Sequence, residues 1–184
     1  RKGYPNYFKA KCTRILPPAD SINNVSVGSV VFQESADSLA RLRSPAIHTR
    51  GNLDDYPFIK PDLVSFDCNH KADFSCEENG VLMAHQDDGV LTSMPGTSFA
   101  APLVTHDLAL LHNKYPNLTT NSIKGLLLHF ANNELGDGVR SKKIRERLIG
   151  FGLPNVERAL YSNNHSSTII VEDEITVGGE KDGK

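Results

Sequence analysis

The sequence contains no tryptophan, two methionines and three cysteines, Cys12, Cys68 and Cys76. An odd number of cysteines cannot pair completely within one chain, and none of the three has the close CxxC spacing of a zinc site. One interpretation is a loop closed by a disulfide between Cys68 and Cys76. The interpretation that we favour is three free thiols in a reducing compartment such as the cytosol, where disulfides are rare.

An excess of charge of one sign and long apolar runs are lacking as well. The 20 basic and 22 acidic residues give a formal net charge of −2, which argues against a general nucleic-acid binder. No apolar run approaches the ~20 residues that cross a bilayer, so no membrane partner is expected. The start, Arg1-Lys2-Gly3-Tyr4-Pro5, has neither an initiator methionine nor an apolar signal segment, which indicates a truncated chain. The length of 184 residues fits one globular domain.

Two strands are predicted from stretches rich in β-branched and apolar residues. Residues 22–32 predict a buried strand between turn-prone segments, and residues 62–66 predict a second, short strand. Between them, residues 33–60 are polar and broken, which indicates a long surface excursion. Scattered glycine and aspartate at 67–95 indicate hairpins and loops.

Three helices are predicted in the second half of the chain. From Ser98 to about Lys114 the apolar residues leave almost no polar face at the start, which predicts a helix buried nearly all round. Pro102 is compatible with it because the first-turn N–H groups of a helix have no intrahelical partner. Residues 119–122 supply N-caps for a second helix, and Asn155 supplies one for a short third helix.

The motif with the clearest chemistry is Gly-Thr-Ser-Phe-Ala-Ala-Pro at residues 96–102. It resembles the serine signature G-T-S-x-A-x-P of the subtilisin-like serine peptidases (subtilase family, peptidase family S8). A serine at a helix N-terminus has its own N–H and the positive end of the helix dipole beside a developing oxyanion. A plain serine N-cap on a core helix is the alternative, but it does not explain the full signature.

The resemblance covers about 150 residues in family order. Residues 17–30 resemble the family's PA-D-A-x-N-x-I-T-V-G-A strand, residues 60–65 its K-P-D-V-x-A-P-G strand, and residues 150–156 the G-x-G-x-x-N-V that opens its last helix. It implies an α/β fold, the C-terminal half of a three-layer α/β/α sandwich with a mostly parallel sheet. Residues 1–162 would be the C-terminal part of the catalytic domain, and residues 163–184 a tail or the start of a following β segment.

The same resemblance implies a serine endopeptidase that cleaves peptide or protein substrates through an acyl-enzyme. Ser98 would be the nucleophile, with Thr97 and Gly96 supporting the oxyanion. Gly3 lies in a Gly-Tyr-Pro segment similar to the family's floor of the specificity pocket, although a surface turn is the alternative. The Tyr4-Pro5 bond is expected to be cis on the same ground.

The rest of the catalytic machinery is not found. A serine hydroxyl needs a base and a group that orients the base, which the family carries in H-G-T and D-[ST]-G motifs. Neither motif occurs, and none of the seven histidines precedes a glycine. His106 and His112 follow Ser98 on its own helix and lie too far along it to reach back, so they are predicted to be helix-surface or core-edge residues.

The family's oxyanion asparagine is absent too, since Gly51-Asn52 falls in the wrong place. The chain alone is therefore expected to be inactive and to need the N-terminal half of the catalytic domain as its partner. Without that half we also expect it to self-associate through exposed strand edges and apolar surface.

Two charged clusters have weaker implications. Residues 140–147 hold five basic side chains in eight, which suggests either an anionic partner site or, as we favour, a solvated face on a loop or short helix. Asp54-Asp55 and Asp87-Asp88 each offer two carboxylates without a third, which is weak for calcium. No cofactor is expected.

Two other functions are compatible with parts of the sequence. A non-catalytic subtilisin-like module would bind peptides or scaffold a partner, and an upstream sequence without H-G-T and D-[ST]-G would favour it. A lipase-type hydrolase is disfavoured because no G-x-S-x-G pentapeptide occurs.

Overall fold

The computed structural model describes residues 15–33, 41–43, 58–67, 81–87, 89–94, 96–133, 141–162, 165 and 167–173. Several predictions fall outside these residues and stay untested. They concern Gly3, the Tyr4-Pro5 bond, Cys12, Cys68, Cys76, Gly51-Asn52, Asp54-Asp55 and Asp88.

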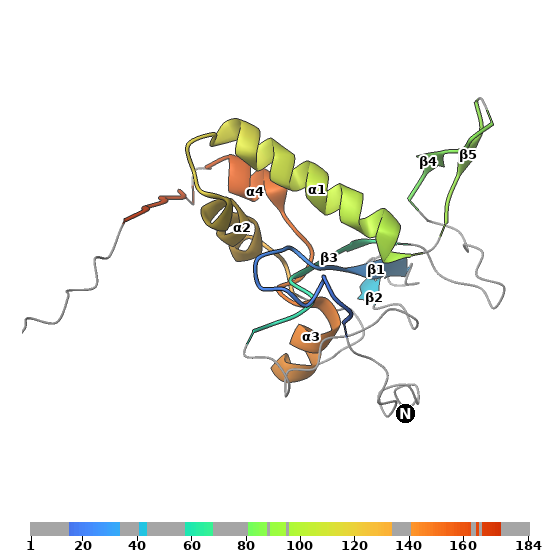
Figure 1. Cartoon of the computed structure of the whole chain (residues 1–184), viewed down its shortest axis with the longest axis horizontal. Coiled ribbons are helices and arrows are strands. Elements are labelled where there is room, and N and C mark those ends of the chain that lie inside the picture. Colours follow the sequence, from blue (N-terminus) through green and yellow to red (C-terminus); the bar gives the residue numbers. More distant parts are fainter. Residues whose placement is uncertain are drawn as a thin grey trace, which may run out of the picture.

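A three-stranded sheet in the order β2-β1-β3 forms the middle layer (Figure 1). The central strand β1 (Val27–Gln33) pairs in parallel with β3 (Leu63–Phe66) and antiparallel with β2 (Arg41–Arg43). Both predicted strands are confirmed, although β1 begins five residues later than expected because the polar residues before it form turns. The interpretation of residues 33–60 as a surface excursion is wrong at β2, whose pairing with β1 its arginine-rich sequence did not suggest.

Helices cover both faces of the sheet, and three of the four in the described part of the chain begin at a residue whose side chain caps them. Thr119 Oγ1 accepts a hydrogen bond from Ser122 N at 3.2 Å, and Asn155 Oδ1 accepts one from Arg158 N at 3.1 Å. The second and third predicted helices are thus confirmed. The helices are α1 (Thr97–Lys114), α2 (Thr120–His129), α3 (Lys142–Ile149) and α4 (Val156–Leu160).

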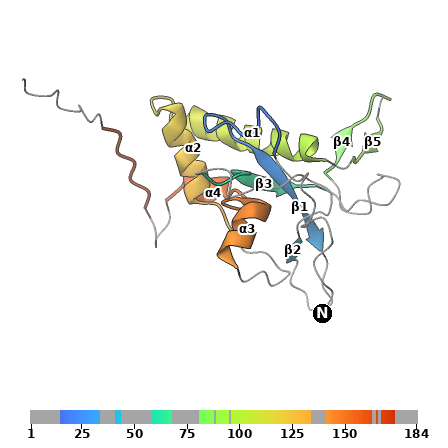
Figure 2. The same ribbon diagram turned by 60° about the horizontal axis from the view of Figure 1, so that its bottom comes forward.

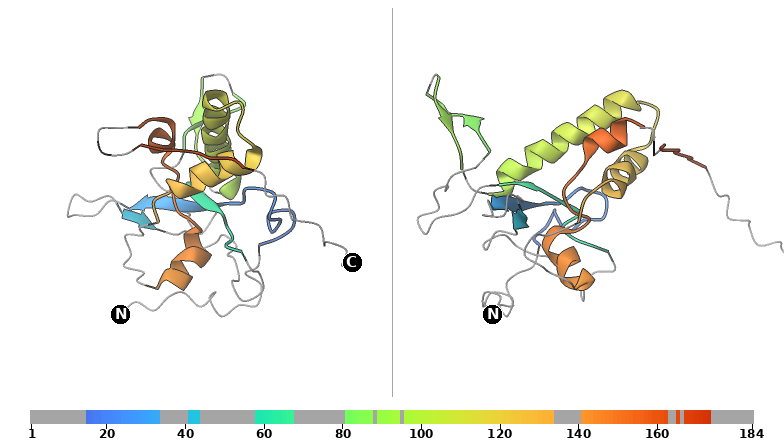
Figure 3. Two further views of the ribbon diagram at one scale, coloured as in Figure 1. Left: turned by 90° about the vertical axis from the view of Figure 1, so that its left-hand side faces the viewer. Right: turned by 180° about the vertical axis from the view of Figure 1, so that it is seen from behind.

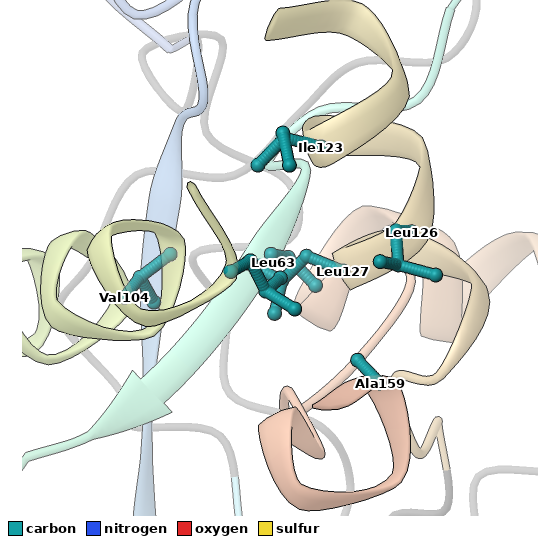
Figure 4. Packing of buried hydrophobic residues seen from close by; sticks show 7 residues of the cluster. Leu63, Val104, Ile123, Leu126, Leu127 and Ala159 are labelled. Carbon is teal, nitrogen blue, oxygen red and sulfur yellow. The ribbon is translucent and has the colours of Figure 1, made fainter. Parts of the chain in front are cut away.

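The alternation of side chains along β3 distributes the core between two layers. Leu63 points into a cluster formed with α1, α2 and α4, whose members are Val104, Leu111, Ile123, Leu126, Leu127 and Ala159 (Figure 4). Val64 points the other way and packs with Val30, Leu148 and Ile149 of β1 and α3. With α3 on one face and the other three helices on the opposite face, the fold is the predicted three-layer α/β/α sandwich (Figures 2 and 3).

The helix α1 is less buried than the sequence predicted. Ala100, Val104 and Leu111 form one buried stripe, whereas Pro102 and Ala109 are exposed. The expectation of burial nearly all round is therefore wrong for this chain. Among the described elements, the contacts of α1 are with the sheet, α2 and α4, which lie on one side of it.

The segment between α3 and α4 passes so close to other backbone that it requires glycine. Gly150 has φ of +60°, and a Cβ atom there would lie 2.0 Å from the Pro61 carbonyl oxygen. A Cβ on Gly152 would lie 2.0 Å from the Asn132 carbonyl oxygen. These contacts explain why the G-x-G pattern stands here, since any side chain would collide with main-chain atoms.

Two further segments lie beyond the core. β4 (Met83–Ala84) and β5 (Leu91–Thr92) form a hairpin that projects from the body just before α1, as expected for part of 67–95 (Figure 1). Residues 167–173 belong to no helix or strand, and the boundary near residue 162 stays a prediction. No helix in the described part of the chain is both long and apolar enough to span a membrane.

Candidate functional site

Ser98 is the second residue of α1, so its predicted position at the helix N-terminus is confirmed. Its side chain is exposed, while Thr97 and Gly96 are half-buried. Gly96 precedes the helix with φ of 139° and ψ of 148°, a conformation that side-chain-bearing residues rarely adopt. The turn that this glycine permits presents the Ser98 hydroxyl at the surface.

The first turn of α1 is suited to stabilising an anion. Gly96 supplies no side-chain cap, and the first turn contains no acidic residue. The N–H groups of Thr97 and Ser98 have no intrahelical acceptor, and the positive end of the helix dipole lies at the same place. An oxygen that gains negative charge beside Ser98 would therefore meet donors that have no intrahelical acceptor and a favourable field.

Pro102 lies deeper in the helix than the sequence predicts. It is the sixth residue of α1 and not part of the first turn. Its missing N–H would otherwise donate to the Ser98 carbonyl oxygen, so that carbonyl lacks its usual helical partner. The explanation given for Pro102 from the sequence is thus wrong, although the helix continues through it.

Asp67 holds the turn that precedes Ser98. It follows directly on β3, its residue is 3% exposed, and its Oδ1 accepts a hydrogen bond from Gly96 N at 2.9 Å. Its own N–H donates to the Val30 carbonyl oxygen of β1 at 2.9 Å. The sequence predicts only hairpins and loops at residues 67–95 and gives Asp67 no role. The available signal was an acidic residue immediately after a buried strand.

A second buried polar cluster lies at the opposite end of β3. Asp62 Oδ2 accepts from Lys60 Nζ at 2.5 Å and from Ser26 N at 2.8 Å, and Asp62 Oδ1 lies 2.9 Å from Lys124 Nζ. Burial opposes the charged form of Asp62, but hydrogen bonds from Lys60, Ser26 and Lys124 outweigh it and lower the pKa below 3.8. The cluster ties β1, β3 and α2 together, and Ser98 stands at the other end of the strand.

The histidines of α1 do not assemble with Ser98. His106 and His112 are exposed, as predicted for helix-surface residues. They follow Ser98 by eight and fourteen residues, which is about 12 and 21 Å along a helix axis. Neither can accept the Ser98 proton.

Carboxylates elsewhere in the described part of the chain form no metal site. No group of three or more histidine, cysteine, aspartate or glutamate residues is found there in an arrangement that could hold an ion. Asp87 instead pairs with His85, with Oδ2 and Nδ1 3.1 Å apart. The basic run forms the short helix α3 from Lys142 onward, where Lys142 is 83% exposed and lies 3.6 Å from Glu146.

A comparison with known protein families agrees with the α/β fold. The model of the subtilase family matches residues 6–152. The chain belongs to the subtilase family. Its α/β fold and its serine signature are those of this family of serine peptidases.

Individual proteins similar to this chain share only a modest fraction of its residues. The uncharacterised protein y4bN of Sinorhizobium fredii is 26% identical over 198 residues, which cover 94% of this chain and 46% of y4bN. The CspB protease of Clostridium perfringens is 26% identical with a TM-score of 0.54, covering 78% of this chain and 27% of that protein. Fervidolysin of Fervidobacterium pennivorans, a keratinolytic enzyme related to subtilisin, is 20% identical with a TM-score of 0.42 over 78% of this chain and 20% of its own. The chain thus spans less than half of each of these proteins.

Proposed function

We propose that the protein containing this chain is a serine endopeptidase with Ser98 as its nucleophile. The observation that carries this proposal is an exposed serine at the start of α1, within the full subtilase signature of residues 96–102. A serine that merely capped a core helix would need neither the glycine-dependent turn at Gly96 nor neighbouring N–H groups without an intrahelical acceptor.

The reaction proposed is acyl transfer. The Ser98 oxygen attacks the carbonyl carbon of a peptide bond, and its proton passes to a base. The carbonyl oxygen becomes negative in the tetrahedral intermediate and accepts hydrogen bonds from the Ser98 N–H, with Thr97 and Gly96 shaping the turn. As the intermediate collapses, the base gives this proton to the departing amine and an acyl-enzyme remains; water, giving a proton to the same base, then attacks the acyl carbon, and the proton returns to the Ser98 oxygen as the acid is released.

We propose that the base, its orienting carboxylate and a further oxyanion donor come from a part of the protein outside this chain. In support, the chain covers 46% of y4bN and 27% of the CspB protease, and His106 and His112 lie too far from Ser98. Peptides or proteins are the proposed substrates, and Gly3 is the proposed contributor to the specificity pocket. The proposed chemistry requires no cofactor.

The test is hydrolysis of a chromogenic peptide by the complete protein and by its Ser98→Ala variant. We expect kcat to fall by about four to six orders of magnitude, since loss of the nucleophile removes the covalent route. Ser141→Ala is the matched control, because Ser141 is also a serine at a helix N-terminus but lies on the opposite face of the sheet. Full activity of the Ser98→Ala variant would contradict the proposal.

The chain by itself is proposed to be inactive. Each absent element of the machinery is worth two or more orders of magnitude in rate. Hydrolysis by the purified chain at the rate of the complete protein would contradict this. If the complete protein binds peptides without cleaving them, the non-catalytic module is the better interpretation.

A further inference from the structure

A hydrogen bond joins Asp67 to Gly96, two residues that are 29 positions apart in sequence. Gly96 is the residue at which the turn before Ser98 begins. Asp67 is nearly fully buried, and its Oδ1 accepts the Gly96 N–H at 2.9 Å. A buried carboxylate is costly to place in a protein unless hydrogen bonds compensate it. Its position beside Ser98 therefore calls for a specific explanation.

The direction of the Asp67 side chain follows from the pleat of β3. Successive side chains alternate between faces, so Leu63, Ser65 and Asp67 point to the same side. Leu63 packs against Val104 and Leu111 of α1, which identifies that side as the one facing α1. The backbone of Asp67 is fixed as well, since its N–H donates to the Val30 carbonyl oxygen at 2.9 Å. The carboxylate is thus held rigidly by the sheet beneath the start of α1.

The Gly96 turn has no side chain of its own that could hold its conformation. Glycine explores more backbone conformations than any other residue, and Gly96 offers no side-chain cap to the helix. The Phe99 N–H donates to the Gly96 carbonyl oxygen at 2.9 Å, which fixes the far side of the turn. Asp67 fixes the near side by holding the Gly96 N–H. The N–H groups of Thr97 and Ser98 have no intrahelical acceptor, so both can donate to a substrate oxygen.

We propose that Asp67 is a positioning residue for the nucleophile: as a hydrogen-bond acceptor it anchors Gly96 to the end of β3 and so sets the orientation of the Ser98 hydroxyl and N–H. This inference rests on the proposed role of Ser98. The property that matters is the acceptor at Oδ1. A displacement of about 1 Å in a catalytic group can cost 10²-fold in rate.

The experiment measures kcat and KM for peptide hydrolysis by the complete protein with Asp67→Asn, Asp67→Leu and Asp67→Ala. Asparagine keeps both the hydrogen-bond acceptor and the size of the side chain. Leucine keeps a similar size without the acceptor, and alanine has neither. We expect kcat within about threefold of wild type for Asp67→Asn and reduced about 10- to 100-fold for Asp67→Leu and Asp67→Ala, with KM changed less than about threefold. Ser65→Ala is the matched control and should leave kcat unchanged. Ser65 is also a buried polar residue, and it lies two residues before Asp67 on the same face of the sheet.

The outcomes separate this inference from the proposed function. Wild-type protein without Ser98-dependent hydrolysis would refute the proposed function, and this inference with it. Active wild type with undiminished kcat in a folded Asp67→Leu or Asp67→Ala variant would refute only the role of Asp67. If neither of these variants folds, Asp67→Asn decides alone, because a loss of more than about tenfold in this variant contradicts a role that needs only the acceptor.

Discussion

At the scale of single residues, main-chain atoms at the start of β3 leave no room for a side chain at Gly150. Its φ is +60°, and a Cβ atom would lie 2.0 Å from the Pro61 carbonyl oxygen and 2.5 Å from that of Asp62. These oxygens belong to the segment that enters β3, so they cannot move without disturbing the sheet.

We predict that Gly150→Ala lowers the free energy of unfolding of the complete protein by roughly 2 kcal/mol or more, because the substitution combines a left-handed backbone with a collision. Gly125→Ala is the control, since a Cβ there meets nothing within 4 Å and the residue lies inside α2. That change should be neutral or stabilise by up to about 1 kcal/mol. Urea denaturation measures both, and equal effects would contradict the contact at Gly150.

Asp62 provides the second prediction at this scale. It is the counter-charge of two lysines, and Lys60 is only 2% exposed. Asp62→Asn should destabilise the complete protein by about 3–5 kcal/mol, because the substitution leaves buried cations without their partner. Asp87→Asn, which removes an exposed carboxylate, should change stability by less than about 0.5 kcal/mol.

The Asp62 effect should depend on pH. Because its pKa is lowered from 3.8 in the folded state, its contribution is present above 3.8 and is lost as the pH falls through the folded-state value. The stability difference between wild type and Asp62→Asn should therefore shrink below pH 3.8 and not above it. A difference that disappears between pH 6 and 8 would contradict this assignment.

At the scale of elements, hydrogen bonds connect the N-terminus of α2 to the segment of residues 167–173. Thr119 caps the helix through Ser122 N, and Glu172 accepts hydrogen bonds from Thr119 N at 2.9 Å and Thr119 Oγ1 at 2.7 Å. Hydrogen bonding to the side chain of Ser122, and then to the side chain and backbone of Thr119, lowers the pKa of Glu172 below 4.5. The segment that contains Glu172 is thereby attached to α2, and its Ile170 packs against the core.

We predict that Thr119→Ala costs about 1 kcal/mol of stability, because it removes the cap. Thr119→Ser keeps the hydroxyl and should cost only a few tenths of this. Chemical denaturation of both variants in the complete protein is the measurement. Equal losses would show that the methyl group of Thr119, and not its hydroxyl, matters at this site.

Local signals in the sequence were sufficient for most elements. The caps Thr119 and Asn155 act within three residues of themselves, so they could be found without a partner. The apolar run after Ser98 predicted the helix α1 but not its burial, because composition does not reveal which faces find a neighbour. The strand β2 depends on pairing with β1, and its sequence alone is polar.

The site was predictable only in part for the same reason. Ser98 lies inside a contiguous signature and was found by its resemblance. The contact between Asp67 and Gly96 spans 29 residues, and Lys124 reaches Asn24 O across 100 residues. Contacts of this range depend on how strands and helices meet, which no local periodicity encodes.

At the scale of the whole molecule, several large apolar side chains in the described part of the chain are exposed to solvent. Examples are Leu91 on the hairpin, 65% exposed, and Ile169 in the C-terminal segment, 86% exposed. Apolar patches and strand edges of this kind favour association with other chains.

We predict that the chain produced by itself self-associates at micromolar concentration, because no other part of the protein covers these residues. Light scattering or sedimentation velocity would measure its mass, and substitution of Leu91 and Ile169 by lysine should reduce the association. A stable monomer with a cooperative unfolding transition would contradict the prediction.

The most direct test of Ser98 as a nucleophile is covalent labelling of the complete protein with a fluorophosphonate, followed by mass spectrometry of its peptides. The phosphonyl group transfers only to a serine whose proton a neighbouring base removes. We predict stoichiometric modification at Ser98, and none in the Ser98→Ala variant. Modification of a different serine in an active protein, or peptide hydrolysis that continues with Ser98 unmodified at saturating reagent, would contradict the assignment.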